Sequence, residues 1–525
     1  MDLLLGLDVG TTGTKAMLVN IEGRTVASAA YSYGLKTPRE DWVEQDPEDL
    51  WRGVVATARR VMDHVNPQDR ILALSISAQG GTTIPVDASY RPVCNAISWM
   101  DHRAREQAEQ LRESVGEDKI YETGGWQLYD GLPLLHVLWL RRRAPEVFAS
   151  ARYFLFVNDF IVYRLTGQLF MDPSDAGITQ LYNISKGCWD EDMRGIAGIE
   201  SSQLSPVRSS GFAIGNLTSE ASEETGLPRS VLVVNGAHDQ YCAALGAGVL
   251  KPGDVMLSCG TAWVILGVMD QLGADAPSFL LKLFQSLRLD PEKRLSISPH
   301  VIPNKWGALK SMGAVGASME WFLNKIWTRR DRQTDLYEEL NECAGKVPAG
   351  SRGLLFFPSS GGYGHGSRGA FIGLAISHSQ DDMARAIMEG IAFDLRWTLE
   401  DVREAGIKSD ELRMVGGAAA SPIWTRIVAD VTHLPVALPS TTQTASFGAA
   451  ILAGVGSGVF SSPEEGYRKL SEAESADHPV ILEPVEENCK RYDELFEIHR
   501  TASQQVHHSL YKLSRFESKQ NAQLL

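Results

Sequence analysis

The stretch Leu3–Lys15, LLLGLDVGTTGTK, decides the fold that the sequence predicts. An apolar run of the kind found in buried β-strands opens it, and Asp8 stands where that run ends. The turn Gly10–Gly13, made of glycine and threonine, comes next. A second apolar run at 16–19 and a third strand-like run at 25–30 follow. The sequence therefore predicts neighbouring strands whose first turn is rich in glycine and hydroxyl groups, with a carboxylate at its entrance.

The residues of this turn have the chemistry of an anion site. Glycines let main-chain N–H groups approach a ligand closely, and successive N–H groups can form an anion-binding nest. Thr11 and Thr12 add donors, Lys15 adds a positive charge, and Asp8 can hold Mg2+ through water. On this stretch alone, a polar hairpin turn is an equally good interpretation. The spacing of a P-loop, G-x-x-x-x-G-K-[ST], is absent.

Length, charge and cysteine usage exclude several classes of protein. A chain of 525 residues is too long for one core and should form two large domains. The net charge of -15 argues against a nucleic-acid partner or an anionic membrane surface. No apolar run is long enough to span a bilayer, and the first residues lack the basic region of a signal peptide. The six scattered cysteines have no metal-binding spacing, as expected for reduced thiols in a cytoplasmic protein.

A second turn of the same kind lies near the middle of the chain. Residues 252–266, PGDVMLSCGTAWVIL, give a strand, the turn Gly260-Thr261 and another strand. Two such turns, one in each half, predict two similar domains that clasp a nucleotide. We place the boundary where glycine and proline interrupt the pattern, so the predicted domains are 1–249 and 250–525.

Two polar segments in the first half are candidates for binding a small ligand. Gln79-Gly80-Gly81-Thr82 follows an apolar run at 71–78, and ligands gather at strand ends in open α/β sheets. A plain tight turn explains this segment equally well. Farther along, Asp101 and Arg103 can bond sugar hydroxyls, and Trp99 can lie against a ring face. The alternative interpretation is a helix cap at Asp101 beside a solvated arginine.

Two strand-to-helix junctions complete the set of candidate sites. Asp239-Gln240 follows the apolar run 231–234 and begins a small-residue helix. A carboxylate there can accept a proton from a hydroxyl, or it can simply cap the helix. In the second half, the strand 412–415 runs into Gly416-Gly417 and then into a helix, an arrangement that suits an anion or a nucleotide.

Taken together, these residues resemble the FGGY carbohydrate kinases of the actin/hexokinase-like ATPase superfamily, over roughly residues 3–500. Residues 369–374 followed by 382–389 fit the C-terminal signature of that family. The other signature lies around 133–140, where His136 replaces the usual lysine. The resemblance implies an α/β fold of two actin/hexokinase-like, ribonuclease H-like domains with an interdomain cleft.

The resemblance also implies ATP and Mg2+ as cofactors and a small sugar as substrate. Asp8 matches the aspartate near the metal, and Asp239 matches the catalytic base, which also lies close to the metal. The positions matched to the nucleotide are Thr11, Thr12, Lys15, Gly260, Thr261, Gly316, Gly417 and Ser421. The positions matched to the sugar are Gln79, Gly80, Gly81, Trp99, Asp101, Arg103, Asp239 and Gln240.

Within the family the chain is most similar to xylulokinases, with one departure. Those enzymes have Q-M-H-G at 79–82, and Gly81 here replaces a histidine expected to touch the sugar. The expected substrate is a ketopentose such as xylulose. Because of this departure, the alternative is another polyol, ketose or autoinducer-2-type signal, and residues 172–177 are similar to the branch that phosphorylates autoinducer-2. A non-catalytic sugar sensor on the same fold is the competing class. We expect a cytoplasmic protein without nucleic-acid or membrane partners, and a homodimer is an open possibility.

Overall fold

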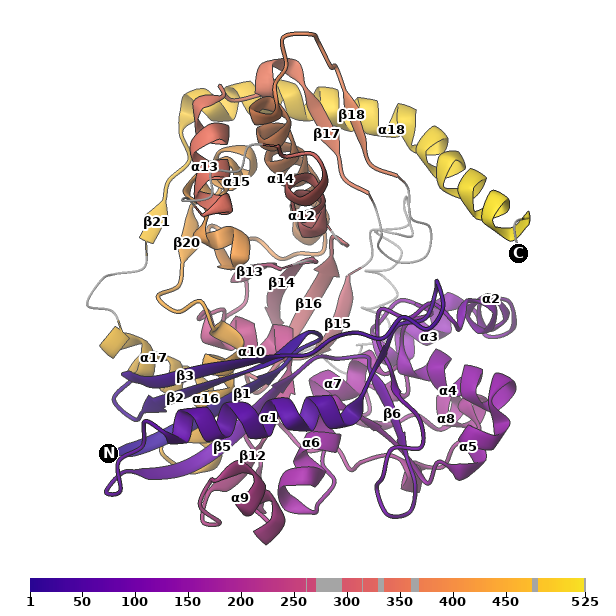
Figure 1. Cartoon of the computed structure of the whole chain (residues 1–525), viewed down its shortest axis with the longest axis vertical. Helices are drawn as coiled ribbons and strands as arrows, with labels where there is room; N and C mark the ends of the chain where they lie inside the picture. The colour runs from indigo at the N-terminus through magenta and orange to yellow at the C-terminus, as the bar shows by residue number, and fades with distance from the viewer. Residues whose placement is uncertain are drawn as a thin grey trace.

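The computed structural model describes residues 1–260, 262–270, 295–313, 315–328, 335–359, 368–474 and 480–523. Its long strands form two sheets, one low and one central in Figure 1, with helices packed on both. The helix α18 (Glu486–Gln523) crosses the top of that view and runs out to the right. Among the described helices, none is both long and apolar enough to cross a membrane. All six cysteines are free thiols.

The first sheet has six strands in the order β11-β12-β5-β1-β2-β3. β1 pairs antiparallel with β2 and parallel with β5, and β12 pairs parallel with β5. The three strands predicted from the opening stretch are therefore confirmed. The bounds are β1 Asp2–Val9, β2 Gly13–Asn20, β3 Thr25–Ser32, β5 Arg70–Ala78, β11 Ala213–Asn216 and β12 Leu232–His238.

Both faces of this sheet are buried, as the continuous apolar run of β1 predicts. Leu3, Leu5 and Leu7 face the helices α1 and α6, whereas Leu4 joins a cluster with α10 and α16. Asp46 caps α1, because its Oδ1 accepts a hydrogen bond from Glu48 N at 3.1 Å. The bounds are α1 Pro47–Met62, α6 Val157–Thr166, α10 Asp239–Gly246 and α16 Thr444–Gly456.

The second sheet has seven strands in the order β15-β16-β14-β13-β19-β20-β21. β13 pairs antiparallel with β14 and parallel with β19, so the turn between β13 and β14 matches the turn between β1 and β2. The strand bounds are β13 Val255–Cys259, β14 Trp263–Asp270, β15 Ser296–Pro299, β16 Lys305–Ser311, β19 Leu412–Gly416, β20 Val436–Leu438 and β21 Val480–Leu482. The helices beside it are α12 Val315–Lys325, α13 Leu336–Lys346, α14 Gln380–Glu404 and α15 Pro422–Thr432.

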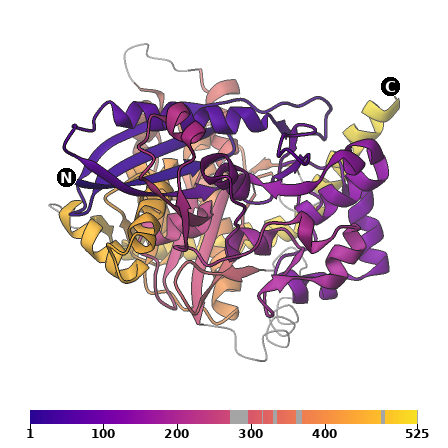
Figure 2. The same cartoon turned by 90° about the horizontal axis from the view of Figure 1, so that it is seen from below.

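The helix α16, late in the chain, packs against the first sheet. A Cβ on Gly6 of β1 would lie 1.8 Å from the main-chain oxygen of Ser446 in α16, so only glycine permits this approach. A Cβ on Gly448 would likewise lie 2.0 Å from the oxygen of Cys242 in α10. Figures 1 and 2 show α16 and α17 (Pro463–Glu474) beside β1–β3. The second half thus reaches over the first sheet, and a boundary at 249/250 stays a prediction.

The remaining elements of the first half surround a small sheet of order β4-β7-β6-β8 and touch the second sheet. Trp126 Nε1 donates to Ser298 Oγ of β15 at 2.8 Å, and Ile297 N donates to Gly125 O at 2.7 Å. The bounds are β4 Glu44–Gln45, β6 Thr83–Val86, β7 Ala96–Ile97, β8 Tyr153–Phe156, β9 Tyr182–Asn183, β10 Cys188–Trp189, α2 Arg105–Ser114, α3 Glu117–Gly124, α4 Pro133–Arg143, α5 Pro145–Ser150, α7 Pro173–Ile178, α8 Glu191–Ala197 and α9 Ser219–Thr225; β17 Leu355–Phe357 pairs with β18 Ala370–Ile372.

Candidate functional site

Two carboxylates meet where parallel strands of the first sheet end. Asp8 lies near the end of β1, and Asp239 is the first residue of α10, directly after β12. Burial, and then the charge of Asp239, raise the pKa of Asp8 to about 6, although Ser77 Oγ donates to its Oδ1 at 2.8 Å. Burial also raises the pKa of Asp239 to about 6, against hydrogen bonds from Gln240. Both carboxylates are thus harder to keep charged than in water, and such an environment favours a cation or a proton.

Asp239 is not the cap of its helix. The N-cap position is His238, and no side chain caps this helix end. The Asp239 side chain is 28% exposed, so its carboxylate reaches solvent at the strand edge. Because α10 packs against strands of both sheets, its first turn lies at the junction of the two halves. The helix-cap interpretation of Asp239 is therefore not supported by the structure.

The two carboxylates fit Mg2+ better than a metal with an all-protein ligand set. Among the described residues there is no group of three His, Cys, Asp or Glu side chains placed to hold a metal ion. Mg2+ is usually held by one or two carboxylates together with water and substrate phosphates. Asp8 and Asp239, whose pKa values burial raises, provide such a partial site. Lys15 is the cross-strand partner of Asp8 and is exposed beside it.

Every carbonyl of the first turn is already bonded, and its two central N–H groups are not. The Tyr33 hydroxyl donates to Gly10 O at 2.7 Å, and the Tyr33 main-chain N donates to Thr12 O at 3.0 Å. Gln45 Nε2 donates to Thr11 O at 2.8 Å, and the last carbonyl accepts from the first N–H of the turn at 3.0 Å. Among the described residues, no acceptor takes the N–H of Thr11 or Thr12. The turn can therefore offer donors to an anion without competing carbonyls.

The predicted nucleotide positions lie around the ends of β13 and β19. Gly260 directly follows β13, Gly316 is in the first turn of α12, and Thr261 lies outside the described residues. Gly417 begins a short 3-10 turn after β19, with no heavy atom closer than 3.9 Å to where its Cβ would be. Ser421 caps α15 through Trp424 N at 3.1 Å. The structure thus brings Gly260 and Gly417 to adjacent strand ends of the second sheet.

Asn341 is a neighbour of the nucleotide positions that the sequence analysis missed. It lies on α13, and its Oδ1 accepts a hydrogen bond from Ser421 Oγ at 2.5 Å. No motif marks this residue, because α13 is remote in sequence from the strand–turn–helix that carries Ser421. Only the packing of α13 against α15 brings the two together.

Two predicted sugar residues are hydrogen-bonded toward the first turn. Trp99 Nε1 donates to Thr11 Oγ1 at 3.1 Å. Gln79 is buried directly after β5, and its Nε2 donates to Gln45 Oε1 at 3.0 Å. Gln45, which the sequence analysis did not single out, therefore stands between Gln79 and the turn. Its local signal is only its place just before the helix start of α1.

The space around Gly80 and Gly81 contains an imidazole from another strand. A Cβ on Gly80 would lie 2.6 Å from Cδ2 of His238, at the end of β12. Burial lowers the pKa of His238 to about 4, so this ring is neutral, and its Nε2 lies 3.3 Å from Asp239 Oδ1. Gly81 has φ +79°, and its Cβ would lie 3.0 Å from Cβ of Trp99. The histidine that the resemblance leads one to expect at 81 is thus absent, while His238 occupies nearby space.

Asp101 and Arg103 form a buried ion pair. Arg103 Nη2 lies 2.8 Å from oxygens of both Asp101 and Glu44, and its side chain is only 4% exposed. The guanidinium also stacks 3.8 Å above the ring of Trp42. Asp101 Oδ2 accepts from Val43 N at 2.6 Å. The interpretation of Arg103 as a solvated arginine is therefore wrong. The bond from Val43 N to Asp101 connects this ion pair to the chain segment just before Gln45.

Asp172–Gly177, the segment similar to the autoinducer-2 branch, folds into the cap and body of the short helix α7. Asp172 Oδ1 accepts the N–H groups of Ser174 and Asp175 at 2.8 and 3.2 Å. Ser174 Oγ in turn accepts from His238 N at 3.0 Å. Burial, and then the Asp172 charge, raise the pKa of Asp175 well above its usual range. The segment therefore supports the end of β12 from behind.

His136, which departs from the family signature, is a core residue. It is fully buried in α4, its Nδ1 lies 3.0 Å from Thr83 Oγ1, and burial lowers its pKa to about 3. A neutral histidine there needs no counter-charge, so this departure has a structural explanation.

Family models match both halves of the chain. The FGGY family of carbohydrate kinases, N-terminal domain, matches residues 3–246, and its C-terminal domain matches residues 255–457. The chain belongs to the FGGY family of carbohydrate kinases. It is therefore a sugar kinase of this family, with the two-domain actin/hexokinase-like fold that the sequence predicts.

Several FGGY relatives match nearly the whole chain at low identity. A xylulose kinase of Bacillus subtilis is 28% identical over 95% of this chain and 96% of its own. A gluconokinase of the same organism is 26% identical, with 94% of each chain covered. An autoinducer-2 kinase of Yersinia enterocolitica is 28% identical, with 91% of each covered. These FGGY proteins act on different substrates at similar identity, so they do not select one for this chain.

Solved structures agree with this fold. The crystal structure of a ligand-bound xylulose kinase from Lactobacillus acidophilus superposes with a TM-score of 0.86 at 23% identity, covering 98% of this chain and 100% of that one. A xylulose kinase from Rhodospirillum rubrum gives 0.84 at 25% identity, covering 97% and 100%. The likeness to the first shows the fold alone.

Proposed function

We propose that the protein is an ATP- and Mg2+-dependent kinase that phosphorylates a primary hydroxyl of a small sugar, a ketopentose such as xylulose. The observation that carries this proposal is the pairing of Asp8 with Asp239 beside a turn whose carbonyls are all bonded and whose Thr11 and Thr12 N–H groups have no acceptor among the described residues. Phosphoryl transfer needs mainly positioning and charge neutralisation. When bound, Mg2+ supplies charge neutralisation for the phosphate oxygens.

Asp239 acts as the general base in this proposal. A sugar hydroxyl is a poor nucleophile at neutral pH, and a positioned base typically contributes roughly 10²–10⁴-fold. Asp239 has its pKa raised to about 6, close enough to neutrality to be ionised yet to accept a proton readily. Its carboxylate would take the hydroxyl proton at Oδ1 or Oδ2, while Asp8 and Lys15 belong to the metal and phosphate side.

The nucleotide is assigned to the strand ends of the second sheet. Gly260, Gly417 and Ser421 lie there, and glycine leaves the main chain accessible to a ligand. Asn341 joins this set through its bond to Ser421. Thr11 and Thr12 would hold phosphate oxygens through their free N–H groups.

The sugar is assigned to the region between Gln79, Trp99 and Asp239. Gly80 and Gly81 let neighbouring side chains pack closely against the main chain there, and His238 places a neutral imidazole against Gly80. Relatives that are xylulose kinases support a ketopentose substrate. A gluconokinase and an autoinducer-2 kinase at similar identity support the alternative substrates.

A coupled ADP-release assay tests the proposal. The panel would contain D-xylulose, L-xylulose, D-gluconate, glycerol and the autoinducer-2 precursor, each with Mg2+ and with excess chelator. We expect sugar-dependent ADP release that the chelator abolishes, with D-xylulose among the accepted sugars. Binding of a sugar by calorimetry without ADP release for any compound would instead establish a non-catalytic sensor.

A further inference from the structure

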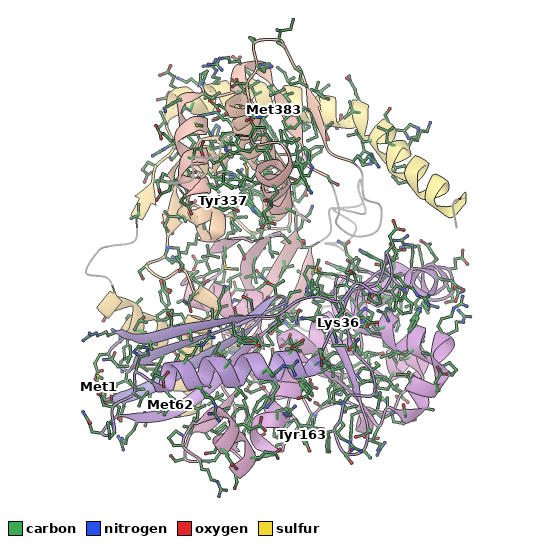
Figure 3. All side chains as sticks on the ribbon, viewed as in Figure 1. Met1, Lys36, Met62, Tyr163, Tyr337 and Met383 are labelled. Carbon is green, nitrogen blue, oxygen red and sulfur yellow. The ribbon has the colours of Figure 1, made fainter. Side chains whose placement is uncertain are left out.

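Gln45 lies at the centre of an unassigned link between the sugar side and the phosphate turn. It is the second residue of the short strand β4 and only 1% exposed. Its side chain bonds Thr11 O on one side and Gln79 on the other, at 2.8 and 3.0 Å. Lys36, labelled in Figure 3, marks the loop before β4 on the side of the first half that faces the second.

The chemistry of the acceptor fixes the direction of every bond in this link. The carbonyl of Thr11 can only accept, so the Gln45 atom that faces it must be the amide nitrogen. The remaining Gln45 atom is then Oε1, and Gln79 must face it with Nε2. Gln79 is thereby left with its oxygen Oε1 pointing away, buried and without a partner among the described residues. Donors run in one direction, from Gln79 through Gln45 to the turn.

This link complements the bonds that hold the rest of the turn. Tyr33 holds the carbonyls of Gly10 and Thr12, and Gln45 is the only donor to the carbonyl of Thr11 that the described residues supply. Without that donor, the Thr11–Thr12 peptide is free to rotate, and its N–H no longer has a fixed direction. A buried carbonyl left without a donor is also costly, which favours such a rotation.

We propose that Gln45 is a positioning residue that transmits occupancy of the sugar pocket to the ATP-phosphate turn. This inference rests on the proposed function, because it needs both ligands. A sugar hydroxyl that donates to Gln79 Oε1 completes the chain of aligned hydrogen bonds, and such chains strengthen each member bond. The Thr11 carbonyl is then held more firmly, so the bound sugar favours the turn that accepts phosphate. Trp99 adds a parallel connection, through its indole N–H to Thr11 Oγ1.

Binding measurements on three variants test this role without requiring turnover. Gln45→Leu removes both hydrogen bonds, and Gln45→Glu keeps the shape but loses the donor to Thr11. Gln107→Leu is the matched control, because Gln107 is also buried, at 4% exposure, on α2, and its side-chain atoms have no partner within the described part of the chain. The probe is AMP-PNP with Mg2+, titrated by calorimetry with and without the sugar that gives the highest kcat/KM in the ADP assay.

We expect Gln45→Leu and Gln45→Glu to bind AMP-PNP about five- to tenfold more weakly, the effect of one hydrogen bond. The sugar should tighten AMP-PNP binding in the wild type and in Gln107→Leu, and this effect should disappear in both Gln45 variants. By linkage, AMP-PNP should tighten sugar binding in the wild type by the same factor, and this effect should also disappear in both Gln45 variants.

The outcomes separate this inference from the proposed function. Wild-type affinity and wild-type coupling in a folded Gln45→Glu protein would overturn the role of Gln45 while leaving the kinase assignment intact. An equal loss in Gln107→Leu would also overturn it, because any buried glutamine would then suffice. If the wild type itself did not bind AMP-PNP, the proposed function would fail and this inference with it.

Discussion

Apart from the additional strand β15, the two sheets share a strand order, but they differ in the side chains at the ends of their strands. In the first, Asp8 near the end of β1 is bonded by Ser77 from β5, and β5 continues into the buried amide of Gln79. In the second, β13 ends in Cys259, and β19 continues into Gly416 without a side chain. The same topology therefore presents charged and amide groups at the strand ends of the first sheet, and bare main chain at the strand ends of the second.

Under the proposed function, this difference assigns proton and metal chemistry to the first sheet and nucleotide binding to the second. Carboxylates whose pKa values are raised, such as Asp8 and Asp239, suit proton and metal chemistry on a small substrate. An edge of glycine suits close approach to a nucleotide, since no side chain stands in the way. This chain thus uses a similar arrangement of strands twice, with different residues at the strand ends and one additional strand, β15, in the second sheet.

The largest expected effect comes from removing the proposed base, Asp239, at the strand ends of the first sheet. Asp239→Asn keeps the shape of the side chain but cannot accept the hydroxyl proton, so kcat should fall by roughly 10²–10⁴-fold with nucleotide binding retained. Steady-state kinetics and calorimetry measure this. Asp190→Asn is the control, since Asp190 caps α8 through Met193 N at 3.1 Å. A near-normal kcat in Asp239→Asn would move the base elsewhere.

The pH dependence of activity and stability should depend on the carboxylates at the strand ends of the first sheet, and not on the second sheet. Because the pKa of Asp239 is raised to about 6, kcat/KM should fall about tenfold per pH unit below that value. Stability has the opposite sign: a raised carboxyl pKa means that the folded state holds the proton more tightly, so stability is lost as pH rises through 6. Asp239→Asn should therefore raise Tm at pH 8 and leave it unchanged at pH 4. An equal Tm shift at both pH values would exclude this electrostatic origin.

Alanine substitutions at Gly416 and Gly417, at the strand ends of the second sheet, should have different effects, one on stability and the other on ATP binding. Gly416 has φ +91°, and its Cβ would lie 2.7 Å from Cys259 O, so Gly416→Ala should lower the free energy of unfolding by about 1–3 kcal/mol. A Cβ on Gly417 meets nothing closer than 3.9 Å, so Gly417→Ala should keep its stability and raise KM for ATP. Urea unfolding and kinetics distinguish them. Identical stability in both variants would refute the assignment of strain to Gly416.

The smallest effect should come from returning a histidine to the sugar side. Gly81→His places a side chain at φ +79° and 3.0 Å from Trp99, which costs about 1–2 kcal/mol in stability. One restored hydrogen bond is worth on the order of 1 kcal/mol, so the preference for D-xylulose should change only several-fold. Ratios of kcat/KM across ketoses measure this. A ratio equal to that of the wild type would mean that position 81 does not face the sugar.

Local patterns predicted the strands and turns because those signals are carried by neighbouring residues. The run at 3–5 and the turn at 10–13 depend on nothing outside the stretch. The strand β12 shows the limit: the sequence indicates a break at Asn235-Gly236, yet the strand continues to His238. A Cβ on Gly236 would lie 1.6 Å from Ile76 O, so this glycine permits close strand contact and does not end the strand.

The residues that the sequence analysis missed are defined by partners far along the chain. Gln45 is hydrogen-bonded to Thr11 and Gln79, and Asn341 is hydrogen-bonded to Ser421. Neither stands in a pattern with a period or a spacing of its own. The buried pairing of Arg103 with Glu44 could not be predicted for the same reason, since it depends on how a loop folds back over the strand ends.

The packing of α16 on the first sheet has a consequence for biosynthesis. A ribosome finishes β12 and α10 roughly 200 residues before it reaches Thr444, the first residue of α16. At typical elongation rates this interval lasts roughly 10–40 s. During that time Leu4 and Met17 lack one of the helices that cover them, so the nascent first half exposes apolar surface. Such a surface is where a chaperone would engage the emerging chain.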